Sequence, residues 1–303
     1  ATVSCAGGAS AIVKFDLNRE AFDGETLELE ISGLTGGHSG IEINKGLGNA
    51  HKDMARLCYE LLRAGDMRLV EIGGGSADNV IPKESKAVVV VKDSSKALNV
   101  CNEFEKKIKH ERKGDPGYTL TCKKVKAELV PMDFESSQKV ITFMNCSPNG
   151  IQELTMGMNN FPQTSLNLGI VSTEKDKAGF VYAVRSSVDS EKEMVCHRLE
   201  NLAVVLGGEY TQEGVYPGWE YQPKSQIRDL LCRIYKEMTG KELVVEAIHA
   251  GLECGFFAEK IPGLDCISIG PNMRNVHTPD EYIEIGSTKR VWEMLLKVLE
   301  ELK

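Results

Sequence analysis

Residues 87–109 have the sequence AVVVVKDSSKALNVCNEFEKKIK. The run of β-branched residues predicts a strand at Ala87–Val91, and the apolar residues at three- and four-residue spacing predict a helix from Ser95 to about Lys109. Upstream, a helix is predicted from about Asn49 to Ala64 and a strand around Arg68–Gly73. The order helix, strand, strand, helix is typical of an α/β unit.

The same order of elements recurs further along the chain. A helix is predicted from Ser137 to about Ser147, strands at Ser165–Ser172 and Gly179–Arg185, and a helix at Ser190–Leu206. The repetition indicates two packed α/β halves. Chance is the alternative, because this pattern is common in α+β folds.

The repeat suggests a division of the chain into domains. Residues 11–215 are expected to form a lid domain with halves at about 11–113 and 118–215, separated by the turn Gly114-Asp115-Pro116-Gly117. Residues 216–303 are expected to belong to a second domain, and residues 1–10 look like a remnant of that same domain.

Residues 216–303 alternate helices with strands, which predicts a parallel sheet covered by helices. The expected elements are a helix at Ser225–Thr239, a strand at Leu243–Ala247, a helix at Leu252–Glu259, a strand at Asp265–Ile269 and a helix at Ser287–Leu302. So few strands need further partners to complete a sheet. The expected fold class is therefore α/β with two domains: a duplicated α+β lid and part of a parallel-sheet domain.

Composition excludes several classes of function. With 303 residues and 42% hydrophobic content the chain can bury a large core, and its net charge of −8 argues against nucleic-acid binding. No apolar run approaches the length needed to span a membrane. Nine scattered cysteines without a Cys-x-x-Cys pair favour reduced thiols in a cytoplasmic protein, and Ala1–Gly8 does not resemble a signal peptide.

Four short segments look like pieces of one metallohydrolase active site. They are Gly36-Gly37-His38-Ser39-Gly40, Ile248-His249-Ala250-Gly251-Leu252-Glu253-Cys254-Gly255, Ile269-Gly270-Pro271-Asn272 and Val276-His277-Thr278-Pro279-Asp280-Glu281. Together they resemble the aminoacyl-histidine dipeptidases, carnosinase-like enzymes of the di-zinc aminoacylase and glutamate-carboxypeptidase clan. The resemblance runs along essentially the whole chain.

This resemblance implies hydrolysis of Xaa-His and related small dipeptides by a metal-activated water. The intact enzyme would hold two zinc ions, with other divalent metals as substitutes. The chain begins at Ala1, where such an enzyme would already have passed its first metal-binding half. We therefore expect a C-terminal fragment that is inactive alone. A non-catalytic lid module that binds peptides or self-associates is the alternative, and formation of a homodimer is left open.

The resemblance also assigns roles to individual residues. His277 would be a terminal zinc ligand, which suits a neutral imidazole. His38, flanked by glycines, would come from the lid and stabilise the oxyanion of the tetrahedral intermediate. Without the resemblance, both would be interpreted as loop histidines.

Further candidates contact the substrate. Arg185 ends a predicted strand, and its planar guanidinium could hold the C-terminal carboxylate of a dipeptide by two hydrogen bonds. Asn79 could offer an amide to the substrate backbone, although a turn role is an equal alternative. Gly251 would let the backbone approach the substrate closely, or would simply be a turn glycine. Glu253 lies at a predicted helix start, where a structural role, through a favourable interaction with the helix dipole, and a contact with the substrate are equal alternatives.

Two segments imitate the metal-binding motifs of the clan. His51-Lys52-Asp53 has the His-x-Asp pattern, but it lies inside a predicted helix, where residues i and i+2 do not share a face. Glu300-Glu301 imitates a catalytic glutamate pair, but it is expected on the solvated face of the last helix. His249 is expected in the wall of the site or in the core.

Overall fold

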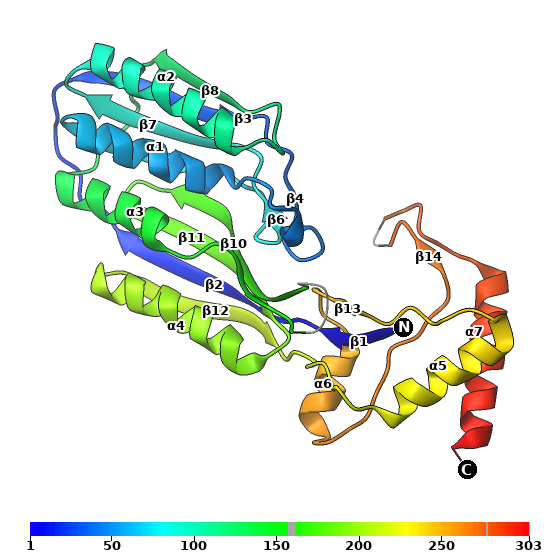
Figure 1. Ribbon diagram of the computed structural model, residues 1–303. Coiled ribbons are helices and arrows are strands. Elements are labelled where there is room, and N and C mark those ends of the chain that lie inside the picture. The colour runs from blue at the N-terminus through cyan, green and yellow to red at the C-terminus, as the bar shows by residue number, and fades with distance from the viewer. Residues whose placement is uncertain (157–160, 277, 303) are drawn as a thin grey trace.

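Two antiparallel sheets form the larger part of the computed structural model, which describes residues 1–156, 161–276 and 278–302; helices α1–α4 lie against these sheets (Figure 1). The first sheet has the order β12-β2-β11-β10-β9, with β2 (Gly7–Asp16), β9 (Gly150–Leu154), β10 (Pro162–Thr173), β11 (Lys177–Ser186) and β12 (Glu209–Tyr216). The second has the order β5-β7-β3-β8, with β3 (Glu25–Ser32), β5 (Met67–Gly73), β7 (Ser85–Val91) and β8 (Thr119–Lys124). The four helices are α1 (Ala50–Ala64), α2 (Ser94–Glu111), α3 (Phe134–Cys146) and α4 (Asp189–Val205).

The two sheets have the same topology. One unit runs β3-α1-β5-β7-α2-β8, and the other runs β2-α3-β10-β11-α4-β12 with one additional edge strand, β9, between α3 and β10. When β9 is set aside and the strands of each unit are numbered along the chain, both sheets have the order 4-1-3-2. The predicted repetition of elements is thus confirmed, and the predicted helices and strands lie within a few residues of the observed ones.

The first strand of the second unit comes from the beginning of the chain. β2 pairs along its whole length with β11, from Gly7 opposite Ser186 to Asp16 opposite Lys177. The expected halves at 11–113 and 118–215 therefore differ from the observed sheets, since residues 11–16 join the first sheet, whose other strands lie at 150–216, and β8 joins the second sheet. The division missed this because pairing between distant strands leaves no mark on local sequence patterns.

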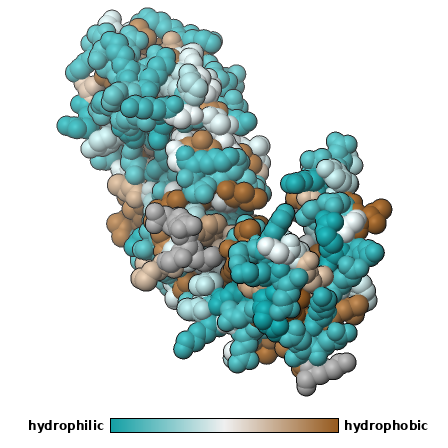
Figure 2. Space-filling view, turned by 45° about the vertical axis from the view of Figure 1, so that its right-hand side comes forward, coloured by the Kyte–Doolittle hydropathy of each residue, from teal (hydrophilic) through white to brown (hydrophobic). Residues whose placement is uncertain are grey.

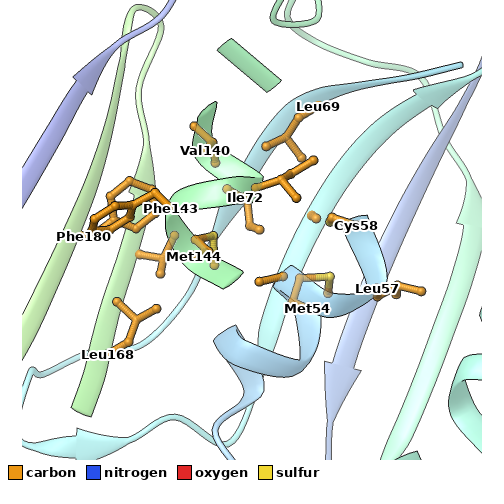
Figure 3. Packing of buried hydrophobic residues seen from close by; sticks show 14 of the residues in the cluster. Met54, Leu57, Cys58, Leu69, Ile72, Val140, Phe143, Met144, Leu168 and Phe180 are labelled. Carbon is orange, nitrogen blue, oxygen red and sulfur yellow. The ribbon is translucent and has the colours of Figure 1, made fainter. Parts of the chain in front are cut away.

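Both units share one hydrophobic core. Phe143 on α3 contacts Phe15 and Phe180, with ring centroids 5.2 and 4.9 Å apart, and the cluster continues to Met54 on α1 (Figure 3). Burial of each such side chain contributes about 1.5–3 kcal/mol. The sheets also meet edge to edge, where the Ile72 N–H donates to the Thr173 hydroxyl at 3.0 Å. The duplicated halves are therefore one packed body.

The His51-Lys52-Asp53 segment lies in the first turn of α1, as predicted, and its side chains point to different partners. His51 is fully buried with Nδ1 2.9 Å from the Ser85 hydroxyl, and the Lys52 ammonium donates to the Ser147 carbonyl beyond the end of α3 at 2.7 Å. Asp53 forms a salt bridge with Arg112. These contacts are structural.

A smaller C-terminal part also contains the N-terminus of the chain (Figure 1). It contains β1 (Thr2–Cys5), α5 (Gln226–Thr239), β13 (Glu246–Ile248), α6 (Glu253–Lys260), β14 (Met273–Arg274), β15 (Tyr282–Ile283) and α7 (Ile285–Glu301). β1 and β13 are parallel, so residues 2–5 of the expected 1–10 remnant join this part, whereas residues 7–10 belong to β2 of the first sheet. The strand expected at 265–269 is absent, because these residues make only a single bridge, between Ser268 and Thr2. One bridge does not make a strand.

On the face shown in Figure 2, both parts are mainly hydrophilic, with scattered hydrophobic patches. None of the helices in the described residues is both long and apolar enough to cross a membrane.

Candidate functional site

The loop that carries His38 is held by short strand pairing and by its own backbone. β4 (Gly37–His38) pairs with β6 (Val80–Ile81), and the His38 N–H donates to the Glu42 carboxylate at 2.8 Å. The N–H groups of Gly40 and Ile41 donate to His38 Nδ1 at 3.0 and 3.1 Å. Because Nδ1 accepts both bonds, the neutral imidazole carries its proton on Nε2.

The charge state of His38 follows from its surroundings. The side chain is half-buried, and desolvation, followed by the nearby Arg185 guanidinium, lowers the pKa of His38 below its ordinary value of 6.5. At neutral pH the group is therefore a neutral hydrogen-bond donor through Nε2.

Arg185 lies near the end of β11 and is 9% exposed. Its Nη1 donates to the Tyr216 hydroxyl at 3.2 Å, and its buried Nε has no partner. Within the described part of the chain, the guanidinium pairs with no carboxylate. A buried cation without a counter-charge costs several kcal/mol, so this geometry favours an anionic ligand.

His249, which follows β13, forms the wall behind these groups. It is buried, with Nε2 2.7 Å from the Ser165 hydroxyl and its ring edge-on to Phe161. Burial, with a smaller contribution from Arg185, lowers the pKa of His249 to about 3. The expected burial, in a wall or in the core, is observed, and the imidazole stays neutral at physiological pH.

Gly40 marks the point where these three residues meet. A Cβ atom there would lie 2.4 Å from the His249 carbonyl oxygen, 3.1 Å from His38 Cε1 and 3.2 Å from Arg185 Nε. Residues from three distant segments therefore converge, and a side chain at position 40 would displace backbone.

Asn79 lies beside the His38 loop. Its carbonyl accepts the Ser39 N–H at 2.9 Å, and its side chain is exposed. The buried Asn167 amide donates to the carbonyls of Asp78 and Val80, both at 2.9 Å. The turn containing Asn79 is thus fixed by a buried amide, and a contact between the Asn79 side chain and a substrate stays a prediction.

The remaining predicted contacts lie around α6. Gly251 is exposed, and a Cβ there would lie 2.8 Å from the Tyr216 ring. The close approach at this glycine is therefore to Tyr216. Glu253 is exposed at the first residue of α6, where a negative charge suits the helix dipole. The structure brings Glu253 into no contact with His38 or Arg185.

The predicted zinc ligand, His277, lies outside the described residues. Within residues 1–156, 161–276 and 278–302, no three His, Cys, Asp or Glu side chains are grouped so as to hold a metal ion. The described residues therefore do not fit a metal centre by themselves.

Sequence reasoning missed two residues of the site, Tyr216 and Ser165. In the sequence, Tyr216 stood only at the start of the second expected domain, and Ser165 only at the start of a predicted strand. A polar residue at a strand end next to a Pro-Gly turn is the signal that could have found Tyr216.

Comparisons with known proteins identify the family of the chain. The model of peptidase family M20/M25/M40 matches residues 4–301. The chain belongs to this family. Over 305 residues it is 33% identical to the cytosol non-specific dipeptidase of Escherichia coli (strain K12), covering 99% of this chain and 63% of that relative.

One solved structure of an M20 relative is closely similar. The aminoacylhistidine dipeptidase from Vibrio alginolyticus superposes with a TM-score of 0.94 at 32% identity, covering 99% of this chain and 62% of the other. The M20 fold with its lid is therefore established for this chain, which spans less than two thirds of either relative.

Proposed function

We propose that this M20 chain is the substrate-holding part of a metal-dependent cytoplasmic dipeptidase that cleaves Xaa-His and related dipeptides. The observation that carries the proposal is the buried Arg185 guanidinium, which has no carboxylate partner among the described residues. Both relatives named above are dipeptidases.

Arg185 would bind the free carboxylate of the dipeptide. A guanidinium offers paired N–H donors in the geometry of a carboxylate, and burial strengthens the pairing. The ligand would supply the missing counter-charge, which favours dipeptides over peptide amides.

His38 would donate its Nε2 proton toward the substrate carbonyl as negative charge develops on that oxygen. Its tautomer is fixed before substrate arrives, because Nδ1 already accepts two backbone N–H groups. A preoriented donor of this kind contributes strongly to catalysis. His249 would close the wall of the site as a neutral group.

Metal chemistry is part of the proposal by family resemblance, with His277 as a ligand. Two zinc ions, or other divalent metals, would supply an activated water when bound. The described residues supply no complete ligand set, so further ligands must come from elsewhere in the active enzyme.

The test compares two substrates on matched variants of the active dipeptidase. Arg185→Ala should reduce kcat/KM for an Xaa-His dipeptide by about 10- to 100-fold, since a hydrogen bond to a charged group contributes about 1.5–3 kcal/mol. Cleavage of the corresponding Xaa-His amide should change little. Arg185→Lys should restore activity only in part, because lysine presents a point charge.

Arg198→Ala is the matched control, since Arg198 is exposed on α4. If the acid-to-amide ratio is the same in wild type and Arg185→Ala, Arg185 does not bind the carboxylate. Peptide binding without hydrolysis, even with zinc present, would favour the non-catalytic lid module.

A further inference from the structure

The segment Tyr216-Pro217-Gly218 is packed against glycines on several sides. A Cβ at Gly7 would lie 2.4 Å from the Gly218 nitrogen, and a Cβ at Gly8 would lie 2.5 Å from the Tyr216 hydroxyl oxygen. On the other side, a Cβ at Gly251 would lie 2.8 Å from Tyr216 Cε2, and one at Gly255 would lie 2.6 Å from the Pro217 carbonyl oxygen. The tyrosine is therefore held between β2 and the loop that precedes α6.

The backbone of this segment is fixed as well. The buried Lys192 ammonium donates to the Tyr216 carbonyl at 2.8 Å and to Asp189 at 2.6 Å. Asp189 in turn accepts the Gly218 N–H at 3.2 Å. Both the backbone and the ring of Tyr216 are thus constrained, which gives its hydroxyl a defined position.

That hydroxyl is the hydrogen-bond partner of Arg185, 3.2 Å from Nη1. Among the described residues, the guanidinium has no carboxylate that could orient it. A long arginine side chain without such a partner otherwise samples several rotamers, at a cost in entropy when it binds.

We propose that Tyr216 is a positioning residue that fixes the Arg185 guanidinium for a substrate carboxylate. This rests on the proposed role of Arg185 as the carboxylate-binding residue. Tyr216 acts through Arg185 and does not itself contact the substrate. The glycines around it keep the ring in place, so that the hydroxyl accepts one N–H of the guanidinium, at Nη1, and leaves its other N–H groups to the ligand.

The experiment measures equilibrium binding of L-Ala-L-His and of L-Ala-L-His amide to this chain by calorimetry. Tyr216→Phe keeps the ring between Gly8 and Gly251 and removes only the hydroxyl. It should weaken binding of the acid about tenfold, as expected for one lost hydrogen bond to a charged group, and leave binding of the amide unchanged. Gly8→Ala displaces the hydroxyl of an intact tyrosine. It should likewise weaken binding of the acid relative to binding of the amide.

The control is Tyr221→Phe. Tyr221 contacts Arg228 through its ring, with Arg228 Cζ 5.5 Å from the ring centroid, so loss of its hydroxyl should leave this contact intact. If Tyr216→Phe weakens binding of the acid and of the amide equally, Tyr216 has only a structural role, and the proposal is overturned. An unchanged affinity for the acid would overturn it as well.

A second readout separates this inference from the proposed function. Side-chain NMR of Arg185 reports rotation about its Nε–Cζ bond without any ligand, and Tyr216→Phe should accelerate that rotation. Suppose that wild type binds acid and amide equally well and that Tyr216→Phe still accelerates the rotation. The proposed binding of a carboxylate by Arg185 is then wrong, but Tyr216 does hold the Arg185 guanidinium in place. Unchanged rotation in Tyr216→Phe overturns the positioning role whatever the substrate.

Discussion

Replacing His51 by asparagine should make the folded state less sensitive to mild acid. His51 is fully buried on α1, and burial lowers its pKa from 6.5 to about 4. An asparagine places an amide nitrogen where Nδ1 meets the Ser85 hydroxyl, so the hydrogen bond survives while the titrating group is lost.

The sign and size of the effect follow from proton linkage. Between pH 6.5 and 4 the unfolded chain binds a proton at His51 that the folded chain does not bind. The stability due to neutral His51 is therefore complete above pH 6.5 and is lost as the pH falls toward 4. Linkage with these two pKa values gives a loss of about 2 kcal/mol between pH 7 and pH 5.

Urea unfolding followed by circular dichroism at both pH values measures this quantity. The drop in the free energy of unfolding from pH 7 to pH 5 should be about 2 kcal/mol smaller in His51→Asn than in wild type. Any cavity left by asparagine lowers the free energy of unfolding equally at pH 7 and at pH 5, so it cancels in the difference between them. His110→Asn is the control, since His110 is exposed on α2. Equal drops in wild type and His51→Asn would refute the reasoning.

Two further predictions concern the site and its metal. In the active dipeptidase, His38→Ala should lower kcat by about 100- to 1000-fold with metal content unchanged, and normal turnover would make His38 a loop residue. This chain purified alone should bind no stoichiometric metal and hydrolyse no dipeptide, because its described residues offer no ligand cluster; two tightly held zinc ions per chain by elemental analysis would contradict this.

Local patterns in the sequence were sufficient for most elements of the lid. The valine run at 87–91 became β7, and the helix after it became α2. Helix starts were predicted because Ser, Asp and Asn stand near them, although Asp93 and Asp133 are the residues that cap α2 and α3. The short C-terminal strands were harder, since residues 265–269 are apolar enough for a strand but have too few backbone partners.

The sequence by itself determined the family, the repeated order of elements and the candidate residues His38 and Arg185, because these depend on local periodicity and short motifs. Only the tertiary structure decided that β2 joins the sheet of β9–β12, that His38 carries its proton on Nε2, and that Tyr216 contacts Arg185. These three findings depend on contacts between residues distant in the chain or on hydrogen-bond geometry. The spacing of residue types in the sequence encodes neither such contacts nor such geometry.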